Sequence, residues 1–349
     1  ITQDEFPSAG TYDGASSVGY LGGYWLATLA GTDLLYIQIP AATTWDPIEF
    51  ATAEYGPDKL VAIRVSGEIA WLLGEATLEG WRVTGDATLP FAPAGGLKFD
   101  VGCRSRPAAV NCRGTLIFVD AECSVRMTNG GEPRIISDNG LAEQIRRCDA
   151  GDLRASFFVK DGHPLYVLTL GTAGTWIYDL ANEAWTRANS QGYDYWRADL
   201  FCNIGDTVLS RDAISSQIYR LDPDLRTDAG ETFTRVFTAV LALAEGAAQI
   251  ANIQLDCLTG DSPRSGQGSD PLVVMKLSRD RGKTWGPQRE RSLGVTGDWD
   301  VRPRWNGMGQ VRAPHGLWAE FFVSDPVGLR VNAIRVNVPR SEEHTSELQ

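Results

Sequence analysis

The sequence predicts an all-β protein: a β-propeller of short antiparallel blades, followed by a C-terminal β-rich module. Three observations lead to this prediction. Short apolar and aromatic runs recur at about 8–12-residue spacing, with Gly, Asp and Asn between them. The larger pattern repeats about every 40 to 50 residues, as propeller blades do. One segment only, residues 137–148, is predicted to be a helix.

The first strands are predicted between residues 19 and 86. Residues 19–40 read GYLGGYWLATLAGTDLLYIQIP and are expected to form two strands joined by a turn at residues 30–33. Residues 59–86 are expected to form three strands, at 60–65, 69–74 and 78–84, because glycine-containing or polar turns separate these apolar runs.

The same plan recurs at residues 110–137, 156–188 and 199–224. In TWIYDLANEAW a strand leads through a turn to Trp185, as in kelch-type blades, so Trp185 is expected to pack between blades. The predicted helix at 137–148 has Asp138 or Asn139 as its N-cap and basic residues in its last turn. We expect it to bridge two blades.

Longer strands follow Asp228, so the domain boundary is placed near Thr227. Residues 1–227 are predicted to be propeller blades, and residues 228–340 a C-terminal β module or the final blades. The last ten residues read RSEEHTSELQ, which looks like the translation of a common sequencing adapter. Residues 341–349 are therefore expected to be a disordered artefact, and without them the net charge is −9 rather than −12.

The acidic balance argues against a general nucleic-acid binder, which needs a basic face to replace counterions on phosphate. It allows a smooth contact with DNA that slides past, because an acidic wall repels phosphate. No apolar run is long enough to span a bilayer, so no membrane partner is expected. The chain begins at Ile1 without a visible leader or an initiator Met, so its true start is expected to lie upstream.

Cysteine and histidine usage predicts no metal and no cofactor. No two cysteines form a C-x-x-C pair, and the chain has only three histidines. Reduced, mostly buried thiols in a protein made in a cytosol are expected instead. The six cysteines are Cys103, Cys112, Cys123, Cys148, Cys202 and Cys257.

Residues 278–285, SRDRGKTW, fit the Asp-box pattern Ser-x-Asp-x-Gly-x-Thr-Trp that sialidases repeat around their propeller. Only one copy is present, and each of its residues has a role in a β-hairpin turn. A glycosidase needs two positioned carboxylates, and no nucleophile elbow or phosphate-binding loop occurs. We therefore expect no enzyme; a glycan-binding or sialidase-like propeller remains the alternative. The predicted structural turn consists of Ser278, Asp280, Gly282, Thr284 and Trp285.

A basic cluster interleaved with tryptophan follows this turn, and it is the candidate interface. Trp and Arg are common anchors of protein contacts, while phosphate pairing and stacking are a further interpretation. The simpler alternative is a set of cross-strand pairs with Glu290, Asp298 and Asp300. The candidate interface consists of Arg289, Arg291, Trp299, Arg302, Arg304, Trp305 and Arg312. No residue is assigned to DNA.

The C-terminal run from LSRDRGKTW through RPRWNGMGQVR to SDPV resembles the end of tail proteins of short-tailed phages. The upstream part is similar to one family of them, the packaged-DNA stabilisation proteins, also called tail accessory factors or the tail hub. The resemblance covers nearly all of residues 19–338. In the upstream part it rests on Phe50, Ala53, Glu54, Pro57, Asp58, Gly74, Glu75, Glu79, Trp81, Gly85, Pro90, Phe91, Gly102 and Cys103.

The resemblance implies a structural virion protein at the tail and portal vertex, assembled in the cytoplasm of the bacterial host. Copies would form a homo-oligomeric ring below the portal and its adaptor, extend the portal channel and help retain packaged DNA until ejection. DNA would pass through without sequence-specific contacts. The family has further β structure upstream of the position of Ile1, so the propeller is expected to be incomplete at its N-terminus.

Overall fold

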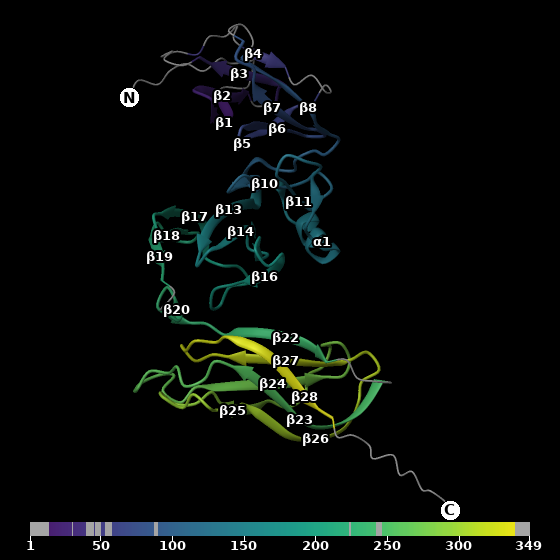
Figure 1. Cartoon of the computed structure of the whole chain (residues 1–349), viewed down its shortest axis with the longest axis vertical. Coiled ribbons are helices and arrows are strands. Elements are labelled where there is room, and N and C mark those ends of the chain that lie inside the picture. Colours follow the sequence, from purple (N-terminus) through teal and green to yellow (C-terminus); the bar gives the residue numbers. More distant parts are fainter. Residues whose placement is uncertain are drawn as a thin grey trace, which may run out of the picture. The chain divides into compact units, whose positions relative to one another are not determined.

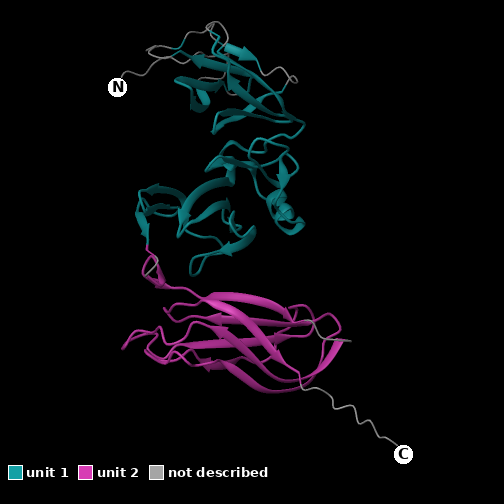
Figure 2. Cartoon of the chain, in the orientation of Figure 1, with its two compact units in different colours: residues 1–221 teal, residues 222–349 magenta. Residues whose placement is uncertain are grey.

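A computed structural model describes residues 14–29, 31–39, 45, 50–52, 58–86, 90–222, 225–241 and 246–338. The chain divides into two compact units, residues 1–221 and residues 222–349 (Figure 2). The boundary predicted from sequence, near Thr227, lies a few residues after this division. Residues 341–349, assigned to an adapter, lie outside the described residues.

The described residues of unit 1 form five antiparallel sheets, each built from strands that follow one another in the chain (Figure 1). We call each sheet a blade. The first blade is β1(Ala15–Leu21), β2(Tyr24–Leu29), β3(Leu34–Gln38) and β4(Phe50–Thr52); the second is β5(Leu60–Ser66), β6(Ile69–Gly74), β7(Leu78–Val83) and β8(Phe91–Phe99). The third is β9(Val110–Cys112), β10(Thr115–Val119), β11(Val125–Thr128) and β12(Arg134–Ile135). The fourth is β13(Leu153–Lys160), β14(His163–Leu170), β15(Thr175–Asp179) and β16(Ala184–Ala188); the fifth is β17(Ala198–Ile204), β18(Thr207–Asp212) and β19(Ile218–Leu221).

Tight turns join the first two strands of every blade. Gly22 and Gly23 both have positive φ, 63° and 93°, as a two-residue hairpin turn between twisted strands requires. The prediction of two strands in residues 19–40 is therefore wrong, because this turn divides the first of them into β1 and β2. The predicted strands of the second blade are confirmed to within one residue at each end.

The core of unit 1 lies between consecutive blades. Strand β6 is buried at all six positions, and successive side chains point to opposite faces of a strand. Leu72 packs with Leu26 and Ile63 in one cluster, while Trp71 packs with Phe118 in the next. The second blade is thus covered on both faces by its neighbours, which is why β6 reads as a continuous apolar run.

The first strands of successive blades contact one another in the order β1, β5, β9, β13 and β17. A serine links them at two of these seams. Ser17 Oγ donates to Ile63 O and accepts from Ile63 N, at 3.2 and 3.1 Å. Ser156 Oγ accepts from Phe201 N at 2.8 Å. Both serines stand five residues before the hairpin turn of their own blade, so the two seams use the same position.

An asparagine forms a second link, two residues before the turn. Asn111 Nδ2 donates to Val65 O at 2.6 Å, across the seam between the second and third blades. Asn203 bonds both backbone groups of Val159, at 3.0 Å each, between the fourth and fifth blades. The asparagine side chains thus bond backbone N–H and C=O groups at the edge of the adjacent blade's first strand. These bonds fix the position of one blade along the next.

We predict that Asn203→Ala destabilises unit 1 by about 1–2 kcal/mol, because two hydrogen bonds at the seam are lost. The Tm should fall by roughly 2–8 °C in a unit of this size. The control is Asn129→Ala, an exposed turn asparagine, which should change the Tm by less than about 1–2 °C. Equal Tm values for the two variants would show that the Asn203 bonds carry no stability.

The predicted helix is confirmed as α1(Asn139–Arg147). Its N-cap is Asp138, whose carboxylate accepts a hydrogen bond from Leu141 N at 2.7 Å. The buried Ile145 packs in a cluster that also contains side chains from the third and fourth blades. The indole N–H of Trp185 donates to Ile136 O at 2.7 Å, so Trp185 connects the fourth blade to the segment after the third.

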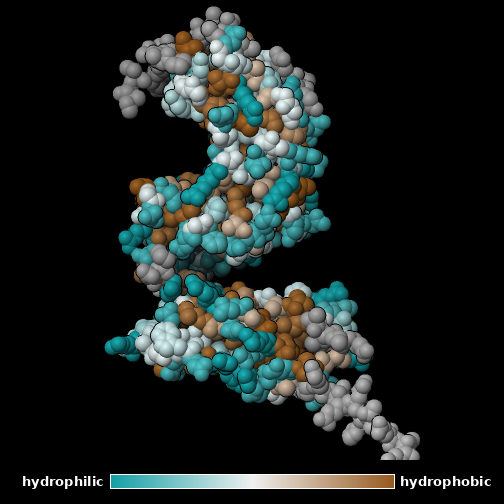
Figure 3. Space-filling view, viewed as in Figure 1, coloured by the Kyte–Doolittle hydropathy of each residue, from teal (hydrophilic) through white to brown (hydrophobic). Residues whose placement is uncertain are grey.

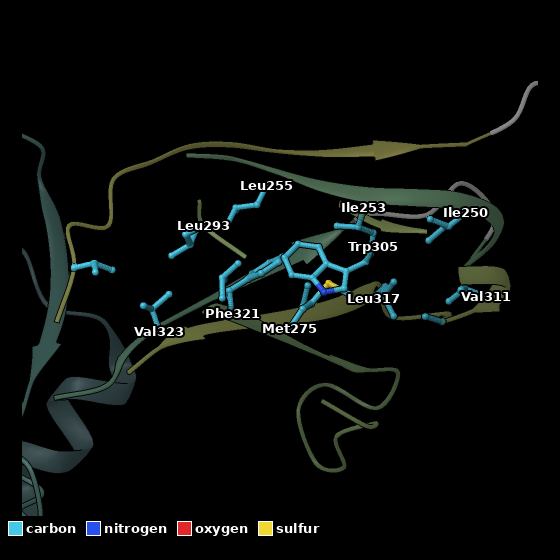
Figure 4. Close-up of a cluster of buried hydrophobic side chains, with 14 residues drawn as sticks. Ile250, Ile253, Leu255, Met275, Leu293, Trp305, Val311, Leu317, Phe321 and Val323 are labelled. Carbon is cyan, nitrogen blue, oxygen red and sulfur yellow. The ribbon is translucent and has the colours of Figure 1, made fainter. Parts of the chain in front are cut away.

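Unit 2 is a sandwich of two antiparallel sheets, preceded by the short pair β20(Thr227–Asp228) and β21(Glu231–Thr232). One sheet has the order β22(Arg235–Leu241), β27(Leu317–Val323), β24(Leu272–Ser278) and β25(Arg289–Ser292). The other has the order β26(Arg304–Arg312), β23(Ala247–Cys257) and β28(Val331–Asn337). Figure 4 shows the buried core between them, with Trp305 near Met275, Leu317 and Phe321.

Apolar side chains also reach the surface, as the brown areas of Figure 3 show for both units. In unit 1, Val18 on β1 and Ile204 on β17 are 55% and 64% exposed. These two strands belong to the first and the last of the five described blades.

Candidate functional site

The Asp-box-like turn connects β24 to β25 and is held by its own side chains. Ser278 Oγ donates to Asp280 Oδ1 at 2.7 Å and accepts from Gly282 N at 2.9 Å. The Asp280 carboxylate also accepts from Thr284 N at 2.9 Å and from Thr284 Oγ1 at 2.6 Å. Gly282 has a φ of 82°, a conformation that glycine adopts without strain. Each of these contacts closes the turn on itself.

A shallow pocket of about 420 Å³ lies beside this turn. Trp285, Met308 and Leu317 supply its apolar lining, and Arg279 and Arg289 its positive charge. Asp280 is the only carboxylate among the lining residues, and its two oxygens bond Ser278 and Thr284. The pocket therefore lacks the second, free carboxylate that glycoside hydrolysis uses.

Hydrogen bonds from Thr284 lower the pKa of Asp280 to about 2. Since the folded pKa lies below the unfolded value of about 4, this carboxylate stabilises the fold above pH 4, and the contribution is lost as the pH falls to about 2. We predict that Asp280→Asn lowers the urea midpoint of unit 2 at pH 7 and that the gap from wild type narrows between pH 4 and 2.

Thr284→Val serves as the second variant, because it removes the hydroxyl donor and keeps the carboxylate. Its urea midpoint should differ less from that of wild type, and the difference should have the same pH dependence. If the difference in urea midpoint between Asp280→Asn and wild type stays constant from pH 7 to pH 2, the ionised Asp280 carboxylate does not stabilise unit 2.

The upstream motif residues meet at one end of the second blade. Asp58 is buried, and its carboxylate accepts from the backbone N–H groups of Glu75, Ala76 and Thr77 at 2.8–3.0 Å. A Cβ on Gly74 would lie 2.0 Å from Asp58 Oδ2, so this position has no room for a side chain. The motif thus ties the start of β5 to the turn between β6 and β7.

The third blade begins against the same turn. Cys103 N donates to Gly74 O at 2.8 Å, and a Cβ on Gly102 would lie 1.8 Å from the backbone oxygen of Glu75. Burial raises the pKa of the Cys103 thiol to about 12, so the thiol stays protonated at neutral pH. The roles of these motif residues are therefore positional.

The other described motif residues also have packing or turn roles. Trp81 Nε1 donates to the buried Glu79 Oε2 at 2.9 Å, and Phe91 is fully buried. Gly85 has a φ of 80°, and Pro90 O accepts from Thr84 N at 2.8 Å. Phe50 is 46% exposed. Ala53, Glu54 and Pro57 lie outside the described residues.

The predicted basic cluster lies partly at one edge of the sandwich, where β25 and β26 come together. Arg291 Nε donates to Arg304 O at 2.7 Å, and Arg289 O accepts from the indole of Trp305 at 2.8 Å. Arg302 lies just before β26 and pairs with Asp300 at 3.3 Å, while Arg312 is at the far end of β26.

Of the three acidic partners considered, Asp300 alone forms an ion pair among the described residues. The backbone carbonyl of Glu290, not its carboxylate, accepts from Arg291 NH1 at 2.6 Å. Cross-strand ion pairing therefore accounts for little of this cluster.

The two tryptophans of the candidate interface have opposite environments. Trp299 is 67% exposed on the loop before β26. Trp305 is fully buried between the two sheets, so it cannot serve as a surface anchor, and this part of the prediction needs correction. The reason is strand alternation: Arg304 and Asn306 point outward, which turns Trp305 inward.

A polar surface that we did not predict covers the outer face of the sheet β26-β23-β28. It carries Arg304, Asn306 and Arg335 at its exposed positions, with Asn252 and Gln254 between them on the central strand. The alternation of polar residues in RWNGMGQVR and NAIRVN is the sequence signal for it. Pairing these two segments on either side of β23 requires the structure.

In the part of the chain that the structure describes, no three His, Cys, Asp or Glu side chains come together as a metal site would need. None of the helices formed by these residues is long and apolar enough to cross a membrane. All six cysteines are free; Cys103, Cys112 and Cys123 are buried, whereas Cys202 is exposed.

Comparison with protein families gives two matches along the chain. A model of the phage stabilisation family described as bacteriophage P22 Gp10, beta-propeller, matches residues 8–226. A second, described as bacteriophage P22 Gp10, beta-sandwich, matches residues 234–337. The predicted all-β fold, a propeller followed by a C-terminal β module, is thereby confirmed. No curated protein matches the sequence.

Solved structures with propeller-like folds resemble the chain only distantly. The WD40 beta propeller domain of Doa1 is 12% identical with a TM-score of 0.35, and the match covers 58% of this chain and 62% of that one. BamB from Moraxella catarrhalis is 9% identical with a TM-score of 0.35, over 88% and 82% of the two chains. A nidogen/laminin complex gives 12% identity and a TM-score of 0.37, over 60% and 75%.

Proposed function

We propose a role in the phage tail from one premise: this chain belongs to the phage stabilisation family of bacteriophage P22 Gp10, a family of phage structural proteins. Copies of the chain form a ring at the portal vertex of the virion, coaxial with the portal and its adaptor. The ring extends the portal channel and helps to retain packaged DNA until ejection. It is assembled in the cytoplasm of the bacterial host.

The observation that carries the proposal is the order of the two family matches over a chain in which the buried motif residues serve packing and turns. Asp58 and Gly74 hold one end of the second blade together, and Gly102 packs the start of the third blade against the same turn. Ser17 and Asn203 link first strands across two of the seams. A blade packed on both faces, as the second blade is, resists deformation. Rigid subunits suit a ring, in which many weak identical contacts add up to a stable assembly.

The charge distribution supports a channel that does not adhere to DNA. Residues 222–349 contain 15 Lys and Arg against 17 Asp and Glu, a net charge of −2, which leaves −10 of the total −12 on residues 1–221. An acidic wall formed by unit 1 would repel phosphate and let DNA slide. A ring whose channel is lined by basic residues from unit 1 would contradict this proposal.

The proposed role does not include catalysis. The Asp-box-like turn uses both oxygens of Asp280 within the turn, and the adjacent pocket has no second carboxylate among its lining residues. A sialidase-like activity would need such a pair. Incubation with a fluorogenic sialoside is expected to release no fluorophore.

The test is to mix the purified protein with portal rings that carry their adaptor and to image the mixture by electron microscopy. We expect an additional ring-shaped layer coaxial with the portal, whose symmetry gives the number of subunits. Portal rings without the adaptor are the control, and they should gain no such layer. If the protein stays monomeric and adds no layer in either sample, the proposal fails, and glycan binding becomes the next function to test.

A further inference from the structure

The outer face of the sheet β26-β23-β28 differs in chemistry from the rest of this acidic chain. We call it the amide–arginine face and define it by Asn252, Gln254, Arg304, Asn306, Arg335 and Asn337. These side chains alternate with core residues such as Trp305 and Ile253, which point between the sheets (Figure 4). None of the six is acidic or aromatic, and Asp256, the next outward position on β23, pairs with Arg335.

Strand register arranges these residues in two rows across the sheet. Gln254 on the central strand is paired with Arg304 on one side and Arg335 on the other. Two residues away, Asn252 is paired with Asn306 and Asn337. Strands lie about 4.8 Å apart and alternate residues about 6.7 Å apart, so the two rows lie close together. Gln254 is buried, whereas Arg304, Asn306, Arg335 and Asn337 are exposed.

Hydrogen bonds within the array hold the side chains in place. Arg304 Nε and NH2 donate to Gln254 Oε1 at 3.2 and 2.7 Å, and Asn337 Nδ2 donates to Asn252 Oδ1 at 2.8 Å. Arg335 donates to Asp256 Oδ2 at 2.9 Å, in the next row. A guanidinium has five N–H groups, so both arginines keep donors for a ligand.

A third arginine extends the face along β26. Arg312 is exposed and paired in register with Ala247 on β23, and no ion pair or hydrogen bond of its side chain appears among the described residues. It lies eight residues from Arg304, at the far end of β26 and beyond the register shift near Ile250. The surrounding segment is basic: residues 271–340 contain 12 Lys and Arg against 6 Asp and Glu.

These features favour a polyanion whose charge lies on its outside. Arginine and amide N–H groups are the usual donors to phosphate oxygens. The six positions offer no aromatic ring on which a sugar or an unstacked base could stack, which disfavours glycans and single strands. We propose that the amide–arginine face contacts the phosphate backbone of double-stranded DNA without reading its sequence. The choice of DNA over another polyanion rests on the function proposed above.

The two units would then act on DNA in opposite ways. Unit 1 carries most of the negative charge and repels phosphate, whereas the amide–arginine face of unit 2 holds it by a few screened contacts. Three arginine contacts per chain give weak binding that is measurable at low salt, and an assembled ring would multiply it. Such contacts restrain DNA while still allowing it to move.

The experiment measures binding of the full chain to a fluorescein-labelled duplex of about 30 base pairs by anisotropy, at 50–200 mM NaCl. Three phosphate contacts predict a salt slope of about −2.7, hence roughly a 40-fold loss of affinity over this range. The triple variant Arg304→Gln, Arg335→Gln, Arg312→Gln should lose most of the binding at 50 mM NaCl and most of the slope. The matching Lys variants should retain both.

The matched control changes the same net charge elsewhere in unit 2: Arg264→Gln, Arg281→Gln and Lys283→Gln, all exposed and outside the face. It should bind DNA within about twofold of wild type. Equal losses in both triple variants would overturn the proposal, since net charge alone would explain them. Binding of an acidic polysaccharide but not of the duplex would also overturn it.

The same variants distinguish this inference from the proposed function. The Gln triple variant should still add a layer to portal rings, because this proposal assigns Arg304 and Arg312 to DNA instead of to protein contacts. Assembly of wild type without any DNA binding would remove the inference and leave the proposed function intact. If the face binds DNA but the chain adds no layer to portal rings, the inference stands and the proposed function fails.

Discussion

Replacing Gly102 with alanine is expected to destabilise unit 1 by about 3 kcal/mol or more, because the new Cβ would lie 1.8 Å from the backbone oxygen of Glu75 and 2.4 Å from its carbonyl carbon. The obstacle is backbone, so no side-chain rotation relieves it. Glu75 is itself held by hydrogen bonds from its N–H to Lys59 O and to the Asp58 carboxylate. The Tm of unit 1 should fall by roughly 6–12 °C.

The effect should be local to the join between the second and third blades. Hydrogen-exchange mass spectrometry of the full chain should show faster exchange in β5, β6 and β9–β11, and unchanged exchange in unit 2. The matched control is Gly95→Ala on β8, where an added Cβ meets no atom within 4 Å. This control should leave the Tm unchanged or raise it slightly. If Gly102→Ala behaves like Gly95→Ala, the close approach does not exist in solution.

Local signals in the sequence were sufficient for the elements that rest on neighbouring residues. The N-cap at Asp138 and the strands of the second blade depend on short-range hydrogen bonding and alternation, which the sequence displays directly. The Gly22–Gly23 turn carried the same kind of signal, and it was missed because the apolar residues around it looked continuous. A pair of glycines between apolar runs indicates a hairpin more strongly than a single strand.

Features that depend on distant segments could not be predicted. The link from Asn203 to Val159 joins residues in different blades, so neither residue is distinctive on its own. The amide–arginine face arises because β23 pairs with β26 on one side and β28 on the other, and a shift of one residue would turn the opposite set of side chains outward. Bulges in β23 next to Ile250 and Asp256 make such a register impossible to count from sequence.

Replacing Trp305 with alanine is expected to destabilise unit 2 by about 3–5 kcal/mol and to lower its Tm by roughly 10–20 °C. The indole is fully buried, its ring centroid lies 5.6 Å from that of Phe321, and its N–H donates to Arg289 O at 2.8 Å. Truncation would leave a cavity between the sheets and remove the bond that joins β26 to β25. Calorimetry of the full chain, with hydrogen exchange in β23 and β27, would measure this loss.

Trp299→Ala is the matched control, because it deletes the same side chain from a site that is 67% exposed. It should change the Tm of unit 2 by less than about 2 °C. The two variants therefore test two roles within the predicted interface. Trp305 stabilises the sheet that carries Arg304, whereas the exposed Trp299 is available to contact a partner. A loss of stability in Trp299→Ala equal to that in Trp305→Ala would place Trp299 in the core and withdraw it as a candidate contact.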